Sequence, residues 1–191
     1  MLFRSSLDGG TTWNTASGTS SWTAGLNLDL LPEGELSLSV KAVDAAGNES
    51  LTVTRDFGND KNPPSVTEER VGTGSIYRNS SFSLGDGFLT DTNGVTRLLV
   101  VQNRVGVSID TIVDNTGLSG TSIPLLLENL PRNPEEPSEL LLENGVYEYT
   151  ITVFDVAGKQ ASLTRTITVD TTSPTVEFTS VAPVVGGNEV N

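Results

Sequence analysis

An internal repeat is the feature that most constrains what this chain can fold into. Residues 34–47 and residues 145–158 align at a constant offset of 111. In both segments apolar residues alternate with polar ones, and both segments end in Asp-x-Ala-Gly. Alternation with a period of two predicts a strand with one buried face, and Asp and Gly favour a tight turn at its end.

A second apolar pattern follows each turn, so each copy predicts a β-hairpin. Three apolar residues of the first copy match three of the second at an offset of 110: Leu51, Val53 and Phe57 against Ala161, Leu163 and Ile167. Each copy then closes on an acidic residue and a proline, Asp60 with Pro64 and Asp170 with Pro174. Proline cannot donate to a strand ladder and stiffens the chain, which suits a boundary between domains.

These boundaries divide the chain into three parts. Residues 1–61 are expected to be the second half of one domain, residues 62–171 a complete domain, and residues 172–191 the start of a third. This organisation indicates a piece of a longer protein, and no secretion signal is visible at its start. Strands are predicted in the middle part near 65–71, 80–84, 95–104, 106–113, 121–128, 145–155 and 161–169. About seven short strands in roughly 100 residues are typical of an antiparallel β-sandwich.

Two segments carry a resemblance to a known family. The sequences VKAVDAAGNESLTVT and ITVFDVAGKQASLTRTITVDTTSPTV resemble the last hairpin and linker of bacterial Ig-like repeats, and more loosely fibronectin type III domains. The resemblance implies an all-β fold of tandem antiparallel Ig-like sandwiches, one complete and two partial. Leu36 and Tyr147 stand where the fibronectin group carries the aromatic of a tyrosine corner, and only Tyr147 has the hydroxyl.

Composition excludes several classes of function. The chain has no cysteine and no histidine, which removes thiol nucleophiles, zinc–thiolate sites and the commonest general base. The formal net charge is −13, and a nucleic-acid binder would need a basic patch instead. No apolar stretch approaches the ~20 residues of a membrane-spanning helix.

The segment from Ser6 to Trp13, SLDGGTTW, matches the Asp-box pattern of sialidase propellers. There it is a structural hairpin, with the Asp capping backbone amides and the Trp packing beneath. A propeller needs several copies and this chain has one, so we interpret the motif as a turn in an Ig-like repeat.

Acidic residues near the predicted boundaries suggest a cation site. Asp60 and Asp170 flank the inter-domain prolines, as does Asp56, and carboxylates at such a junction could hold Ca²⁺. Calcium needs six to eight oxygens, so further residues such as Asp86, Asp91 or Asp114 would have to converge. A plain linker is the alternative, and we favour it. Asp44 and Asp155, at the two hairpin turns, are interpreted as turn caps rather than calcium ligands.

Other candidate residues have simpler explanations. Trp13 and Trp22 could stack on sugar rings, but packing in its own hairpin explains Trp13 better. Glu135 and Glu136 lie in a proline-rich loop, whereas a glycosidase needs two carboxylates held rigidly across a cleft.

The sequence therefore predicts a non-catalytic spacer or stalk repeat of an extracellular or cell-surface bacterial protein, an adhesin in the favoured case. Its partners would be neighbouring Ig-like domains, with a host protein or glycan as a further possibility, and it would need no cofactor apart from the calcium considered above. The alternative is a ligand- or carbohydrate-binding accessory module of an extracellular glycoside hydrolase.

Overall fold

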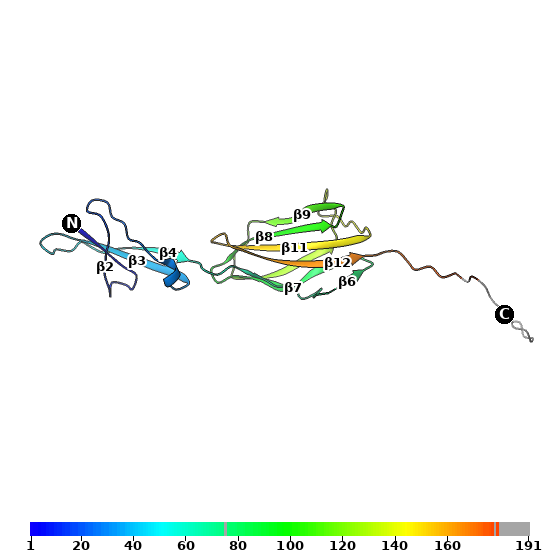
Figure 1. Cartoon of the computed structure of the whole chain (residues 1–191), viewed down its shortest axis with the longest axis horizontal. Coiled ribbons are helices and arrows are strands. Elements are labelled where there is room, and N and C mark those ends of the chain that lie inside the picture. Colours follow the sequence, from blue (N-terminus) through cyan, green and yellow to red (C-terminus); the bar gives the residue numbers. More distant parts are fainter. Residues whose placement is uncertain (75, 178, 180–191) are drawn as a thin grey trace, which may run out of the picture.

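The computed structural model describes residues 1–74, 76–177 and 179, and its regular structure is almost entirely β. Figure 1 shows two parts that follow one another along the long axis. The first is a four-stranded antiparallel sheet, here called the N-terminal sheet, in the order β2-β1-β3-β4. Its elements are β1 (Leu2–Ser6), β2 (Asn14–Thr15), the short 3-10 helix η1 (Leu28–Leu30), β3 (Gly34–Val43) and β4 (Val53–Asn59).

The second part is a sandwich of two sheets. The smaller sheet has the order β10-β7-β5, from β5 (Ser65–Val66), β7 (Phe82–Thr90) and β10 (Ser122–Leu130). The larger sheet has the order β6-β12-β11-β8-β9, from β6 (Ile76–Arg78), β8 (Val95–Arg104), β9 (Ser108–Asn115), β11 (Gly145–Asp155) and β12 (Gln160–Val169). Neighbouring strands are antiparallel except β6 and β12, which run parallel. The predicted all-β, Ig-like sandwich is confirmed.

The core of the sandwich lies between its two sheets. Tyr147, Tyr149, Ile151 and Val153 of β11 face inward and are at most 1% exposed. Leucines of β7 and β10 pack against them from the smaller sheet: Leu84, Leu89, Leu125 and Leu127. Burying one such side chain contributes about 2 kcal/mol to folding, so the alternating pattern of β11 alone fixes which face of the larger sheet is inside.

The two hairpins of the sequence repeat have the same register. Leu36 pairs with Phe57 in the N-terminal sheet, and Tyr147 pairs with Ile167 in the sandwich, as the offsets of 111 and 110 require. Both hairpin turns also contain a glycine with positive φ, at Gly47 and Gly158. The repeat predicted from sequence is therefore a repeat in structure.

The N-terminal sheet differs from the sandwich in one respect. Among the described residues no second sheet covers the face of β3 and β4 that corresponds to the sandwich core. Leu51 is 91% exposed and Val53 is 69% exposed, although Ala161, the counterpart of Leu51, packs against the sandwich core.

The tyrosine corner is present in the second copy. The hydroxyl of Tyr147 donates to the carbonyl oxygen of Glu143 at 2.9 Å, four residues upstream. Leu36 has no hydroxyl and cannot make this bond.

Some strand boundaries differ from the prediction. The strand expected at 65–71 ends at Val66, because the amides of Glu69 and Arg70 both turn to the carbonyl of Gly85. The strand expected at 80–84 continues to Thr90. The three-residue strand β6 was not predicted, since it is too short to show any alternation.

Candidate cation site at the junction

Residues 60–64, here called the junction, link the N-terminal sheet to the sandwich. The carboxylate of Glu33 accepts hydrogen bonds from the junction and from the sandwich. One oxygen of Glu33, Oε2, accepts from the backbone amide of Lys61 and the side-chain amide of Asn62, each at 2.9 Å. The other oxygen, Oε1, accepts from the side-chain amide of Asn93 in the sandwich at 2.7 Å. One carboxylate thus bonds to the linker and to the domain beyond it.

The second copy repeats this contact at its own closing linker. Asn144 stands 111 residues after Glu33, directly before the glycine that starts the hairpin. Its Oδ1 accepts from the backbone amide of Thr171 at 2.8 Å, and its Nδ2 donates to the hydroxyl of Thr172 at 2.7 Å. Sequence reasoning missed both residues, although their shared position in the repeat was a usable signal.

Three carboxylates meet beside the junction: Asp60, Asp91 and Asp155. One oxygen from each lies within 4.8 Å of the others. Asp60 follows β4, Asp91 follows β7, and Asp155 ends β11, so the group draws on both parts of the molecule. Asp155 is 2% exposed and Asp91 is 9% exposed.

The two aspartates of the sandwich are oriented by the turns that they cap. Oδ1 of Asp155 accepts from the amides of Ala157 and Lys159 at 2.9 and 2.8 Å. Oδ1 of Asp91 accepts from the amides of Asn93 and Gly94 at 2.7 and 2.9 Å. Asp-x-x-Gly turns of this kind fix the carboxylate plane while using only one of its oxygens.

The remaining oxygens are poorly satisfied. Oδ2 of Asp60 and Oδ2 of Asp155 are buried and have no hydrogen-bond partner. Leaving a buried acceptor unpaired costs about 1–3 kcal/mol, and more when it is charged. Among the described residues, the ammonium of Lys159 is the one cationic group paired with a member of the group, and it contacts Asp60 through its carbonyl and through Oδ1 at 3.3 Å.

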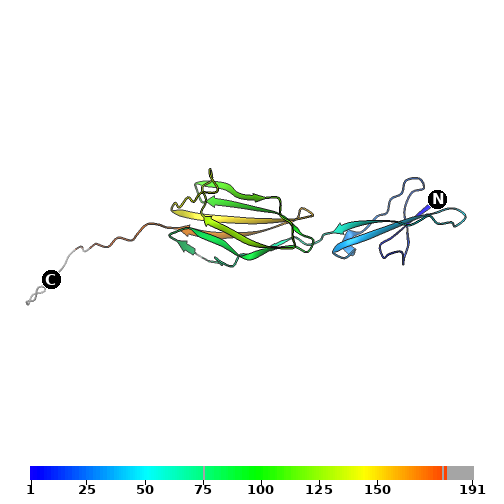
Figure 2. The same ribbon diagram turned by 180° about the vertical axis from the view of Figure 1, so that it is seen from behind.

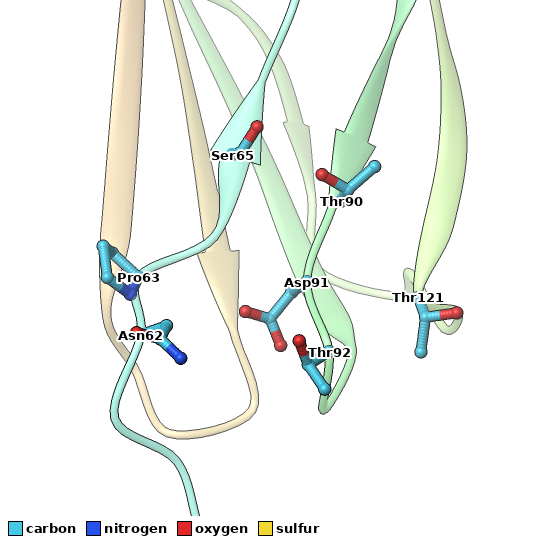
Figure 3. Close-up of a pocket in the computed structure, with 7 residues that line it drawn as sticks. All are labelled: Asn62, Pro63, Ser65, Thr90, Asp91, Thr92 and Thr121. Carbon is cyan, nitrogen blue, oxygen red and sulfur yellow. The ribbon is translucent and has the colours of Figure 1, made fainter. Parts of the chain in front are cut away.

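Two surface hollows border the group. One, of about 520 Å³, is lined by Asp91 together with Asn62 and Thr121. Figure 3 shows the Asp91 carboxylate pointing toward the linker residue Asn62 and away from Thr121. The other hollow, of about 380 Å³, is lined by Asp60 and Lys159. One hollow thus borders Asp91 and the other borders Asp60, and the group has the oxygen ligands that hard divalent cations prefer.

The other acidic residues considered from the sequence lie elsewhere. Asp170 is exposed at the opposite pole of the sandwich, where its amide donates to the carbonyl of Arg78. Asp86 and Asp114 are each paired with an arginine, Arg70 and Arg97, and these ion pairs lower the pKa of both carboxyl groups.

Two further candidates have local partners. Asp56 accepts from the hydroxyl of Ser37 on the neighbouring strand. Asp44 caps its own hairpin turn, with Oδ1 accepting from the amides of Ala46 and Asn48 and Oδ2 from the Asn48 side chain. Hydrogen bonds from the side chain and the amide of Asn48 lower the pKa of Asp44.

The Asp-box segment forms the expected hairpin turn. Asp8 accepts from the hydroxyl of Thr12 at 2.6 Å and from the hydroxyl of Ser6 at 2.7 Å. These bonds and the amide of Thr12 hold the pKa of Asp8 well below its usual value. Trp13 packs under the ammonium of Lys41, 4.3 Å from the ring centroid. The Asp8 carboxylate and the hydroxyls of Ser6, Thr11 and Thr12 are thus all used by the turn itself.

Trp22 lies in an apolar hollow of about 440 Å³ on the uncovered face of the N-terminal sheet. It stacks on Phe3 with ring centroids 6.1 Å apart and is 37% exposed. Leu38 and Val40 line the same hollow, and their repeat counterparts are core residues of the sandwich. Trp22 therefore lies on the face of the N-terminal sheet that corresponds to the core face of β11 and β12.

The proline-rich loop after β10 is anchored at its start and open at its tip. Gln102, 2% exposed, exchanges two hydrogen bonds with the backbone of Arg132 at 2.8 and 2.9 Å. Glu135 and Glu136 are exposed beyond this anchor, as expected.

Comparison with known proteins gives distant likenesses only. The chain matches no family model and no curated protein. It superposes on the fibronectin(III)-like modules of Clostridium thermocellum CbhA with a TM-score of 0.38 and 14% identity, over 88% of this chain and 76% of that one. It superposes on a tetra-tandem repeat from the extending region of a large adhesion protein with a TM-score of 0.40 and 18% identity, over 89% of this chain and 41% of that one. Likenesses this distant add nothing to what the strand order and the buried contacts already show.

Among the described residues, no helix is long and apolar enough to cross a membrane.

Proposed function

We propose that this chain is a non-catalytic spacer from an extracellular, cell-surface multidomain protein, with an adhesin as the favoured case. Residues 1–61 are the second half of one module, residues 62–171 a complete module, and residues 172–191 the start of the next. The role of such a spacer is mechanical, since it sets the distance and direction between domains outside this segment.

One observation carries the proposal: the chain enters and leaves the sandwich at opposite poles. At the first pole Asp60 lies beside Asp155 at the end of β11. At the second pole the amide of Asp170 donates to Arg78, the last residue of β6, and the amide of Thr171 donates to Asn144, which precedes β11. Figures 1 and 2 show the N-terminal sheet joined to one end of the sandwich and the C-terminal segment leaving the sandwich at the other end. A module with this geometry extends an array with each copy.

The contacts at the junction support a fixed orientation of the N-terminal sheet relative to the sandwich rather than a flexible linker between them. Glu33 bonds to the linker and to Asn93, and Lys159 bonds to Asp60, so side chains from both parts contact the linker. Short linkers stiffened by proline restrict the angles between domains.

The uncovered face of β3 and β4 supports the proposed module boundaries. Arg55 of the N-terminal sheet is exposed, whereas its counterpart Arg165 makes a buried ion pair with Glu68 at 2.8 Å. Glu68 lies just after β5, a strand of the smaller sheet of the sandwich. A complete first module would supply an equivalent sheet from residues preceding this segment.

The carbohydrate-binding alternative has weaker support. Its best aromatic, Trp22, faces the hollow that a covering sheet would fill, rather than an open groove. The exposed carboxylates Glu135 and Glu136 stand on a loop tip and not across a cleft.

A distance measurement between the two parts tests the spacer proposal. The chain has no cysteine, so a pair of spin labels can be placed cleanly with Thr52→Cys and Thr166→Cys, both exposed. Dipolar spectroscopy should give one narrow distance distribution, comparable in width to a control pair within the sandwich, Thr116→Cys with Thr166→Cys. A broad distribution extending to short distances, beside a narrow control, would contradict the spacer role.

A further inference from the structure

We propose that Asp60, Asp91 and Asp155 bind one calcium ion, which links the N-terminal sheet to the sandwich. The binding itself follows from the geometry of these residues. Its consequence, a stiffer spacer, rests on the proposed function.

Charge is the first argument. Three carboxylates converge within 4.8 Å, and the ammonium of Lys159 contacts only one of them. The group therefore carries a net charge of about −2 in a partly buried place, where like charges repel more strongly than in water. A divalent cation would neutralise that charge.

The unpaired oxygens are the second, independent argument. Asp155 is 2% exposed, and its Oδ2 has no partner even though Oδ1 is fully used by the turn. Oδ2 of Asp60 is also buried and unpaired. Buried polar groups nearly always have a hydrogen-bond partner in folded proteins. Two buried oxygens without partners, on two of the three clustered aspartates, therefore point to a missing ligand.

Ligand chemistry selects calcium. The group offers only oxygen, which hard cations prefer to the sulfur and nitrogen donors used by zinc. Calcium–oxygen bonds of about 2.3–2.6 Å allow two ligands of one ion to lie up to about 5 Å apart, whereas magnesium at about 2.1 Å allows only about 4.2 Å. Magnesium also binds through one or two carboxylates and keeps its waters, while calcium accepts three carboxylates with waters completing six to eight ligands. The two hollows beside the group can supply those waters.

Lys159 is the natural competitor of the ion. Its ammonium neutralises Asp60 in the structure, and its side chain is 35% exposed, so it can turn to solvent when an ion binds. The first copy has Asn48 at the corresponding position, which carries no charge.

The repeat extends the site to other junctions. Asp44 corresponds to Asp155, and Asp170 corresponds to Asp60. Asp170 would then lie beside the turn aspartates of the following module, as Asp60 lies beside Asp91 and Asp155. Asp44 would lie beside the aspartate that ends the preceding module. The sequence-based proposal of calcium at Asp60 and Asp170 is thus refined: each of the two contributes to a different junction.

Calorimetric titration of the 191-residue chain with CaCl₂ tests the site. One ion should bind with a dissociation constant in the range of extracellular modules, about 10⁻⁴–10⁻³ M or tighter. Asp155→Asn and Asp60→Asn should each weaken binding at least about tenfold. Asn keeps the Oδ1 acceptor that caps the turn, and residue 60 lies outside the strands, so both variants should stay folded. The matched control Asp44→Asn makes the same change in the same motif away from the junction and should leave binding unchanged.

Two further measurements sharpen the test. Lys159→Asn should bind calcium more tightly than the parent chain, because the competing charge is gone. Calcium at 100 times its dissociation constant should raise the ratio of folded to unfolded sandwich about 100-fold, seen as a higher melting temperature.

Several outcomes would overturn the site: no heat of binding up to 10-fold above about 1 mM calcium, equal affinity for Asp155→Asn and the parent chain, or magnesium binding as tightly as calcium. The spacer proposal fails separately. Calcium binding together with a broad spin-label distance distribution would refute the spacer role but not the calcium site. A narrow distance distribution without calcium binding would refute the calcium site but not the spacer role.

Discussion

The two stacked tyrosines of β11 predict opposite effects from the same substitution. Tyr147 and Tyr149 lie with ring centroids 6.4 Å apart, and both are almost fully buried. The Tyr147 hydroxyl donates to Glu143, whereas the Tyr149 hydroxyl is buried without a partner. Tyr147→Phe should therefore destabilise the sandwich, and Tyr149→Phe should stabilise it.

The magnitudes follow from the hydrogen bonds involved. Loss of the Tyr147 bond should cost about 1 kcal/mol, the usual net contribution of one hydrogen bond. Removal of the unpaired Tyr149 hydroxyl should return about 1 kcal/mol of its desolvation cost. For a domain of this size each change corresponds to a melting-temperature shift of about 4 °C, in opposite directions.

Urea unfolding can separate the two parts of the chain, because both tryptophans lie in the N-terminal sheet segment and all three tyrosines lie in the sandwich segment. Because tryptophan also absorbs near 275 nm, both tryptophans are first replaced by phenylalanine, and circular dichroism at that wavelength then reports the sandwich tyrosines alone. If Tyr149→Phe lowered the free energy of unfolding as much as Tyr147→Phe, the two hydroxyls would have the same environment, and the reasoning would fail.

Burial also predicts how the sandwich responds to alkali. It raises the pKa of Tyr147 and, more strongly, that of Tyr149 above the ordinary value of 10. Their contribution to stability is complete below pH 10 and falls at higher pH, because the unfolded chain loses its phenolic protons first. Tyr149→Phe should therefore flatten the loss of stability between about pH 10 and 12, measured by urea unfolding.

Two further predictions concern charged groups. The pKa of Asp8 is held low by Thr12, so the contribution of Asp8 to stability should be complete above the ordinary carboxyl pKa of 3.8 and should fall progressively at lower pH. Urea unfolding followed by tryptophan fluorescence from pH 7 to pH 2 should show this decline, and Asp8→Asn should remove it. Arg165→Met leaves Glu68 buried and unpaired and should cost about 3–5 kcal/mol in urea unfolding, whereas Arg55→Met, the same change at the exposed repeat position, should stay within about 0.5 kcal/mol.

The hairpins of the repeat could be predicted from sequence because their information is local. Period-two alternation and a turn motif fix the strands, and one buried face fixes their register, so Leu36 opposite Phe57 follows directly. The tyrosine corner at Tyr147 also depends on a partner only four residues away. Strand β6 has three residues and no pattern, and its partner β12 is about 90 residues later, so nothing local could indicate it.

The acidic group shows where sequence reasoning stops. Asp60 was identified from the proline beside it, and Asp155 from its turn, but as separate features. Their convergence with Asp91 depends on β7 and β11 ending at the same pole, which is a property of the sheet order. A shared signal did exist, since Asp91 and Asp155 both begin Asp-x-x-Gly turns directly after long strands.

Small-angle scattering on the whole chain tests the central claim most directly, namely that the modules are held end to end. Strands of 10 and 11 residues at about 3.3 Å per residue give bodies of about 33 and 36 Å, hence about 70 Å in line. A rod of that length has a radius of gyration of about 20 Å before any tail is added, whereas a compact chain of this size has about 16 Å. A value of about 20 Å or more, with the scattering profile of an elongated particle, is the predicted result. A value near 16 Å would mean that the N-terminal sheet folds back on the sandwich, and it would contradict the account.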